Sequence, residues 1–181
     1  MDKDKAWAVL REAEMVCSEA VIGEALRALA AEISARLHER YPLVLSVMGG
    51  SVIFSGQLLP LLAFPLEFDY LHATRYDGTT RGGQLQWKAL PRRPIAGRVV
   101  LVLDDILDAG DTLSAIKRRL LDEGAAEVLC AVFADKDIGR PKPVRPDFVG
   151  VQLPNRYVFG FGMDVEEVWR NLPAIYALRE H

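Results

Sequence analysis

Three aspartates follow a short apolar run near the middle of the chain, and a small turn comes directly after them. Asp104 and Asp105 follow the run 99–103, Asp108 comes three residues later, and the turn 109–112 reads Ala-Gly-Asp-Thr. Carboxylates accept hydrogen bonds from sugar hydroxyls, and the backbone N–H groups at a helix start form a cradle for a phosphate. This spacing therefore indicates a ribose-phosphate site.

Two other phosphate-binding motifs are excluded by the residues around Gly110. A P-loop needs a lysine after its second glycine, but Gly110 is followed by Asp-Thr. A dinucleotide fingerprint needs three spaced glycines directly after the strand, and this stretch lacks them. The remaining alternative is an ordinary strand–turn–helix unit with a solvated acidic turn. Three acids at a strand end repel one another without a cation or ligand, which favours the binding site.

Apolar runs and stripes predict the elements that position these residues. The run 99–103 is typical of a strand buried on both faces of a parallel sheet. Further strands are predicted at 43–48, 66–76, 84–90, 127–134 and 148–153, and helices at 18–38, 51–62 and 112–123. Alternating strands and helices predict an α/β fold with a mainly parallel sheet flanked by helices. The pattern of 154–181 favours no element.

Length and composition restrict the class of protein. The chain has 181 residues, 50% of them hydrophobic and 26% charged, which predicts one soluble domain. The net charge of −3 does not favour nucleic-acid binding, and no apolar run approaches the ~20 residues of a membrane span. We therefore predict no nucleic acid and no membrane among its partners. Cys17 and Cys130 lie far apart in apolar contexts, so we expect reduced buried thiols and a cytoplasmic protein.

The stretch 99–113 resembles the phosphoribosyl-pyrophosphate signature of type I phosphoribosyltransferases: an apolar strand, two acids, two apolar residues, an acid and a small-Gly-x-Thr turn. Residues 132–171 resemble the carboxyl-terminal part of the hypoxanthine-guanine members of that family. The matching segments are Ala-Asp-Lys at 134–136, Pro-Asp-Phe-Val-Gly at 146–150, Leu-Pro-Asn-Arg-Tyr-Val-Phe-Gly at 153–160, Met-Asp at 163–164 and Trp-Arg-Asn at 169–171.

The resemblance implies the type I phosphoribosyltransferase fold, a mainly parallel twisted sheet flanked by helices. It implies a single domain over 1–181, with a core at about 40–153. A small hood subdomain would form mainly from 154–181, with a possible N-terminal contribution.

The activity implied by the resemblance is purine salvage. Such an enzyme uses Mg²⁺ to transfer phosphoribosyl from phosphoribosyl pyrophosphate to hypoxanthine or guanine, which gives IMP or GMP and pyrophosphate. Two alternatives stay open: a xanthine-preferring phosphoribosyltransferase, and a non-catalytic nucleotide-sensing regulator with the same fold. Because relatives are commonly dimers or tetramers, the resemblance also implies a homo-oligomer.

The resemblance further implies a role for each of several residues. The ribose, the 5′-phosphate and Mg²⁺ would be held by the signature residues Asp104, Asp105, Ala109, Gly110, Asp111 and Thr112. Pyrophosphate would contact Gly49, Gly50, Arg75 and Arg170. The purine would contact Lys136, Tyr157, Val158 and Asp164, and Asp164 would also help to bind a second Mg²⁺. Asp108 would be the catalytic group that handles the N7 proton, and Tyr76 would belong to a lid over the reacting centre.

The chemistry of lysine agrees with a 6-oxopurine substrate. Lysine donates hydrogen bonds and accepts none, so Lys136 suits a 6-oxo group and disfavours the 6-amino group of adenine. Without the resemblance, Lys136 would be read as a solvated lysine at a strand end, and the glycines at 49–50 as an ordinary turn. The chain departs from many relatives at Gly49, where they have lysine, and at Arg75, where they have serine. Arg75 is therefore our candidate to supply the missing cation.

Overall fold

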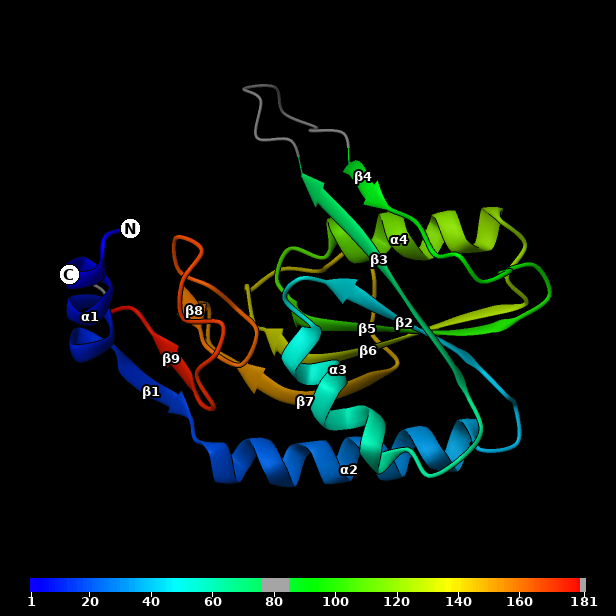
Figure 1. The fold of residues 1–181 in the computed structure, drawn as a ribbon, viewed down its shortest axis with the longest axis horizontal. Helices are drawn as coiled ribbons and strands as arrows, with labels where there is room; N and C mark the ends of the chain where they lie inside the picture. Colours follow the sequence, from blue (N-terminus) through cyan, green and yellow to red (C-terminus); the bar gives the residue numbers. More distant parts are fainter. Residues whose placement is uncertain (76–84, 180–181) are drawn as a thin grey trace.

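The computed structural model describes residues 1–75 and 85–179 (Figure 1). Its centre is a six-stranded sheet with the strand order β4-β3-β2-β5-β6-β7. These strands are β2 (Leu43–Met48), β3 (Glu67–Arg75), β4 (Leu85–Ala89), β5 (Val99–Leu107), β6 (Glu127–Lys136) and β7 (Phe148–Leu153). Neighbouring strands run parallel except for β3 and β4. The predicted α/β fold with a mainly parallel sheet is confirmed.

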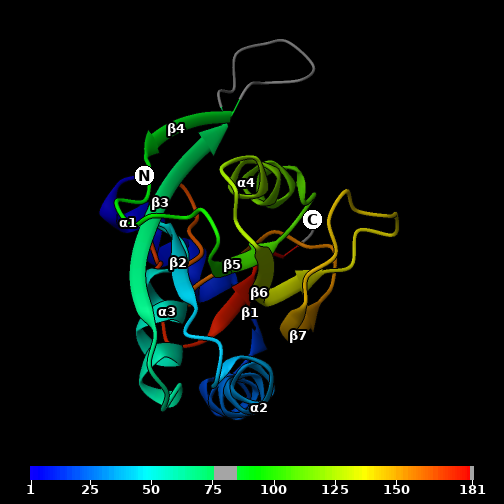
Figure 2. The same ribbon diagram turned by 90° about the vertical axis from the view of Figure 1, so that its right-hand side faces the viewer.

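Helices cover both faces of this large sheet (Figure 2). They are α2 (Glu19–Leu37), α3 (Val52–Leu58) with the short 3₁₀ helix η1 (Leu59–Leu61), and α4 (Asp111–Asp122). In β5, Leu101 and Leu103 pack in the core with α2 and α3, whereas Val100 and Val102 pack in the core with α4. Successive strand residues point to opposite faces, so burial on both faces requires the continuous apolar run. In the described part of the chain, no helix is both long and apolar enough to cross a membrane.

The structure corrects the predicted end of β5. The side-chain pattern placed its end at Leu103, but β5 continues to pair with β6 as far as Leu107, opposite Asp135. Asp104 and Asp105 therefore lie within the strand and not after it. The apolar pattern stops at the two acids, whereas backbone pairing does not depend on side-chain polarity.

A second, antiparallel sheet lies at the carboxyl end of the large-sheet strands (Figure 1). It contains β1 (Glu14–Cys17), β9 (Ile175–Ala177) and β8 (Val158–Phe159) in the order β1-β9-β8. Helix α1 (Lys3–Glu12) precedes β1. Because Glu14 pairs with Ala177, segments from both ends of the chain build this small sheet.

β2 and β5 are neighbours, but the strands that follow them in the chain lie on opposite sides of this pair. β2 leads to β3 on one side of the pair, and β5 leads to β6 on the other. In open α/β sheets, ligands bind at the carboxyl ends of the strands where the strand order reverses in this way. The turn at 49–50 and the segment 104–112 both lie at this reversal.

Candidate active site

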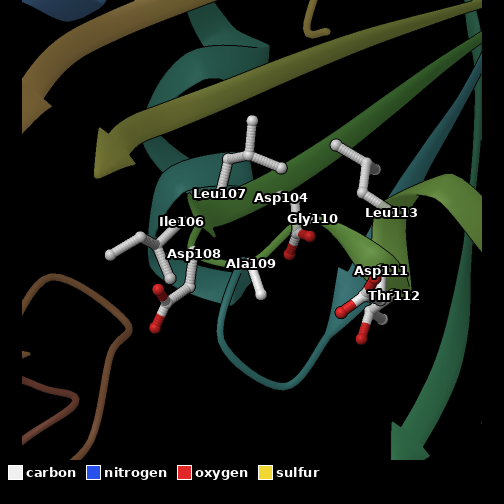
Figure 3. A pocket seen from close by; sticks show the side chains of 9 residues that line it. All are labelled: Asp104, Ile106, Leu107, Asp108, Ala109, Gly110, Asp111, Thr112 and Leu113. Atoms are coloured by element: carbon white, nitrogen blue, oxygen red, sulfur yellow. The ribbon is translucent and has the colours of Figure 1, made fainter. Parts of the chain in front are cut away.

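The turn after β5 forms a pocket of about 240 Å³ (Figure 3). Its lining consists of Asp104 and the residues from Ile106 to Leu113. Gly110, the residue that precedes α4, has a φ of 86° in the left-handed region, which favours glycine. Because glycine has no capping side chain, this helix start suits an anion such as phosphate. The turn predicted to bind the 5′-phosphate is thus a cavity at a helix start.

Asp104 and Asp105 are neighbouring acids that are largely shielded from solvent. Asp104 is 8% exposed, and its Oδ1 accepts a hydrogen bond from the backbone N of Asp105 at 3.2 Å. Burial raises the pKa of Asp104 well above its ordinary value, and the charge of Asp105 raises it further. Burial also raises the pKa of Asp105, against the opposing effects of its hydrogen bonds and of Arg170. A cation or hydroxyl donors would therefore stabilise this pair.

Two glycines approach each other and Asp105 closely. A Cβ added to Gly50 would lie 2.1 Å from Oδ2 of Asp105, and one added to Gly162 would lie 2.0 Å from the carbonyl O of Gly50. A Cβ at Gly49, by contrast, would meet nothing within 4 Å. The close approaches join the turn after β2, the strand β5 and the loop 160–164 at the reversal between β2 and β5.

The predicted catalytic acid and the predicted base-binding lysine form an ion pair. Lys136 Nζ lies 2.8 Å from Oδ2 of Asp108. Lys136, at the end of β6, is 8% exposed, whereas the side chain of Asp108 is 58% exposed. Lys136 is therefore not a solvated lysine, and its charge is directed towards the acid at the pocket.

A second lysine, Lys142, ties the ends of β5 and β6 together. Its Nζ lies 2.5 Å from Oδ1 of Asp135 and donates hydrogen bonds to the carbonyls of Leu107 at 2.7 Å and Lys136 at 2.6 Å. Sequence reasoning did not single it out, because its setting between two prolines shows no periodicity. Only the return of this loop to the strand ends reveals the contacts.

The other predicted base residues lie on the segment from Tyr157 to Arg170. Arg170 Nη2 lies 2.6 Å from Oδ1 of Asp164, and Nη1 donates to the carbonyl of Gly162 at 2.8 Å. The hydroxyl of Tyr157 donates to the carbonyl of Asp164 at 3.3 Å, and Tyr157 is 54% exposed. Val158 is buried in β8. Arg170 therefore connects Asp164 to Gly162, the glycine that packs on the turn at 49–50.

Comparison with known proteins identifies this arrangement. Residues 18–167 match the family model described as the phosphoribosyl transferase domain. The chain belongs to the phosphoribosyltransferase family. This phosphoribosyltransferase is 36% identical over 160 residues to the hypoxanthine-guanine-xanthine phosphoribosyltransferase of Tritrichomonas foetus. The aligned residues cover 88% of this chain and 87% of that relative. The chain is 34% identical over 167 residues to the hypoxanthine-guanine phosphoribosyltransferase of Lactococcus lactis, with 92% and 91% covered.

Solved structures of phosphoribosyltransferases have the same fold. A hypoxanthine-guanine-xanthine phosphoribosyltransferase structure superposes with a TM-score of 0.84 at 32% identity, covering 92% of this chain and 97% of the other. A hypoxanthine phosphoribosyltransferase from Staphylococcus aureus superposes with a TM-score of 0.88 at 25% identity and 95% coverage of each chain. The predicted type I phosphoribosyltransferase fold is confirmed over nearly the whole chain.

The predicted site of this phosphoribosyltransferase is described only in part. Tyr76 and the side chain of Arg75 lie outside the described residues, so the lid and the replacement for a lysine at Gly49 stay predictions. Asp111 is exposed, at the first turn of α4. Both cysteines are buried and free, as expected. The roles of the individual residues in binding and catalysis also stay predictions.

Proposed function

We propose that this phosphoribosyltransferase transfers the phosphoribosyl group of phosphoribosyl pyrophosphate to hypoxanthine or guanine, with IMP or GMP and pyrophosphate as products. The proposal is carried by the ion pair between Lys136 and Asp108, 2.8 Å apart at the phosphate pocket. A 6-oxopurine presents O6 and N7 side by side, so one lysine and one carboxylate match both groups. The names of the relatives in Tritrichomonas foetus and Lactococcus lactis support this choice of base.

The geometry suggests how the reaction proceeds. The 5′-phosphate binds the start of α4, the ribose hydroxyls donate to Asp104 and Asp105, and the pyrophosphate lies by the turn at 49–50 and Arg170. The bond between the purine nitrogen and C1′ forms as the bond from C1′ to pyrophosphate breaks. Lys136 donates to O6 of the bound base, and Asp108 accepts the N7 proton.

The acids at the end of β5 fit a magnesium ion. Carboxylate oxygens are ligands that Mg²⁺ prefers, and it takes the rest from substrate phosphates and water. Within residues 1–75 and 85–179, no group of three or more His, Cys, Asp or Glu side chains could hold a metal by itself. Asp104 and Asp105 would hold one Mg²⁺, and Asp164 would help to hold a second. When bound, the metal neutralises charge on the leaving pyrophosphate.

The test is pyrophosphate release with Mg²⁺, phosphoribosyl pyrophosphate and each of hypoxanthine, guanine, xanthine and adenine. We expect turnover with hypoxanthine and guanine and little with adenine. Xanthine has the same O6 and N7, so this assay also decides the xanthine-preferring alternative. Turnover of adenine above that of hypoxanthine would overturn the proposal, and no turnover with any purine would favour the nucleotide-sensing regulator.

A lysine variant sharpens the same test. Lys136→Met removes the donor to O6, and hydrogen bonds to charged groups contribute about 1.5–3 kcal/mol. We therefore expect kcat/KM for hypoxanthine to fall by roughly 10- to 100-fold. Arg118→Met, which removes an exposed cation from α4, is the matched control and should leave turnover unchanged.

The predicted homo-oligomer and cytoplasmic location complete the proposal. Light scattering at several concentrations would distinguish a dimer or tetramer from a monomer. Fractionation of the source cells would test the location.

A further inference from the structure

The loop 164–170 contains a tight hairpin with an unfavourable turn. Val165 and Val168 pair through backbone hydrogen bonds of 3.0 and 3.1 Å. The two residues between them, Glu166 and Glu167, have φ values of 48° and 71°. Two-residue turns with positive φ at both positions favour asparagine and glycine, and other side chains are strained there. Contacts outside the hairpin must therefore stabilise this conformation.

Helix α1 supplies such contacts, and Figure 1 shows it beside this loop at one end of the molecule. Lys5 Nζ lies 2.8 Å from Oε1 of Glu166. The indole nitrogen of Trp169 donates to the carbonyl of Ala6 at 2.9 Å. The rings of Trp7 and Trp169 meet edge to face, with centroids 5.0 Å apart at 66°. The helix buries none of its own residues fully, so its contacts serve the hairpin more than a core.

The hairpin holds two residues of the proposed site, Asp164 for the purine and Arg170 for pyrophosphate. Trp169, which itself has a φ of 71°, is followed directly by Arg170, the partner of Asp164 at 2.6 Å. The backbone N of Glu167 donates to the other oxygen of that carboxylate at 2.8 Å. The direction of both charged groups is therefore set by backbone that α1 stabilises.

We propose that α1 is a positioning element of the purine subsite and acts through the contact between Trp7 and Trp169. The helix offsets the strain of the hairpin and so holds Asp164, the proposed purine contact, and its partner Arg170 in place. Neither tryptophan is among the residues proposed to contact the substrate. This inference rests on the proposed function for its kinetic test, but its structural test does not.

The kinetic test compares two substitutions at Trp7. Trp7→Ala removes the ring contact and should raise the KM for hypoxanthine by about 3- to 10-fold, the size expected for an aromatic pair. Trp7→Phe keeps an aromatic edge and should restore a value within about 2-fold of the original protein. The inhibition constant of ribose 5-phosphate, which occupies the proposed ribose and 5′-phosphate sites but not the purine site, should not change.

The control is Tyr41→Ala, which removes another exposed ring far from the site, before β2. It should leave the KM for hypoxanthine unchanged. An unchanged KM in Trp7→Ala would overturn the proposal. Equal weakening of hypoxanthine binding and ribose 5-phosphate binding would also overturn it, because that result indicates that the substitution destabilises the whole protein.

Hydrogen exchange tests the same proposal without turnover. The backbone N–H groups of Val168 and Gly162, which donate to Val165 and Arg170, should exchange about 3- to 10-fold faster in Trp7→Ala. Those of β5 should not change. If the original protein turns over no purine, the proposed function fails while this measurement still decides the role of α1. Unchanged exchange at the hairpin would refute that role.

Discussion

Replacement of Gly50 by alanine should disable the site by displacing Asp105. The new Cβ would lie 2.1 Å from Oδ2, 2.6 Å from Cγ and 2.9 Å from Oδ1 of Asp105. A carbon and an oxygen that are not bonded approach to about 3.3 Å, so the carboxylate must retreat by about 1 Å. On the other side, Gly162 packs against the carbonyl of Gly50, so the turn has little freedom to move instead.

The size of the effect follows from what the retreat breaks. Oδ1 of Asp105 accepts a hydrogen bond from the backbone N of Ile106 at 2.9 Å, and hydrogen bonds to charged groups contribute about 1.5–3 kcal/mol. Overpacking costs a similar ~1–3 kcal/mol, so we expect the free energy of unfolding to fall by about 2 kcal/mol. A displacement of about 1 Å in a substrate-binding group reduces the rate by roughly 100-fold. We expect that loss in kcat/KM for phosphoribosyl pyrophosphate.

Urea unfolding and pyrophosphate release measure the two effects separately. Gly56→Ala on α3 is the control, because a Cβ there meets nothing within 4 Å. The double variant Gly50→Ala/Asp105→Ala removes the clash, so it should regain stability while its activity stays low. If Gly50→Ala unfolds and turns over as Gly56→Ala does, the close approach has no functional consequence and the reasoning is wrong.

Three further predictions concern buried groups. Asp104→Asn should raise the free energy of unfolding of the ligand-free protein at neutral pH by about 1–2 kcal/mol, because burial raises the pKa of Asp104 above its ordinary 3.8. Between pH 3.8 and the raised folded pKa, the folded state binds a proton that the unfolded chain releases, so the stability of the original protein falls as pH rises through the folded pKa. Urea unfolding at several pH values should show that the gain from Asp104→Asn vanishes below pH 3.8. A gain that persists there would contradict this. Lys142→Met removes the cation that pairs with Asp135 and donates to the carbonyls of Leu107 and Lys136, so it should lower the free energy of unfolding by about 3 kcal/mol. A loss no larger than that of the exposed-lysine variant Lys88→Met would contradict this. Burial raises the pKa of Cys130 to about 12, so its thiol should react with Ellman's reagent only after unfolding, and rapid reaction in the native protein would show that the thiol is accessible.

The strands of the large sheet could be predicted because their burial determines their residues. β2 begins and ends where its apolar run does, since both faces of this strand are covered. β7 also has the predicted bounds, although Gln152 within it is exposed. The end of β5 could not be predicted, because Asp104 and Asp105 interrupt the apolar pattern without interrupting backbone pairing. The strands β1, β8 and β9 have only two to four residues, too few to show an alternating pattern.

Within the site, a similar distinction holds between local and distant contacts. The segment 104–112 is continuous in sequence, so its motif predicted a phosphate pocket without knowledge of the fold. The contact of Gly162 with Gly50 and that of Lys142 with Leu107 join segments far apart in the chain. No local pattern reports such contacts, because they depend on how the loops return to the sheet.

The pairing of Glu14 with Ala177 sets an order of events during synthesis of the chain. The strands of the large sheet, from β2 to β7, all lie between these two partners and can pair before the later one leaves the ribosome. β1 must wait for β9, because its only pairing partner in the described residues is that late strand. A chain interrupted before Ile175 would therefore retain the segments proposed to bind ribose and phosphate but lack β9, the middle strand of the small sheet. We expect such a truncated product to bind phosphoribosyl pyrophosphate without consuming it.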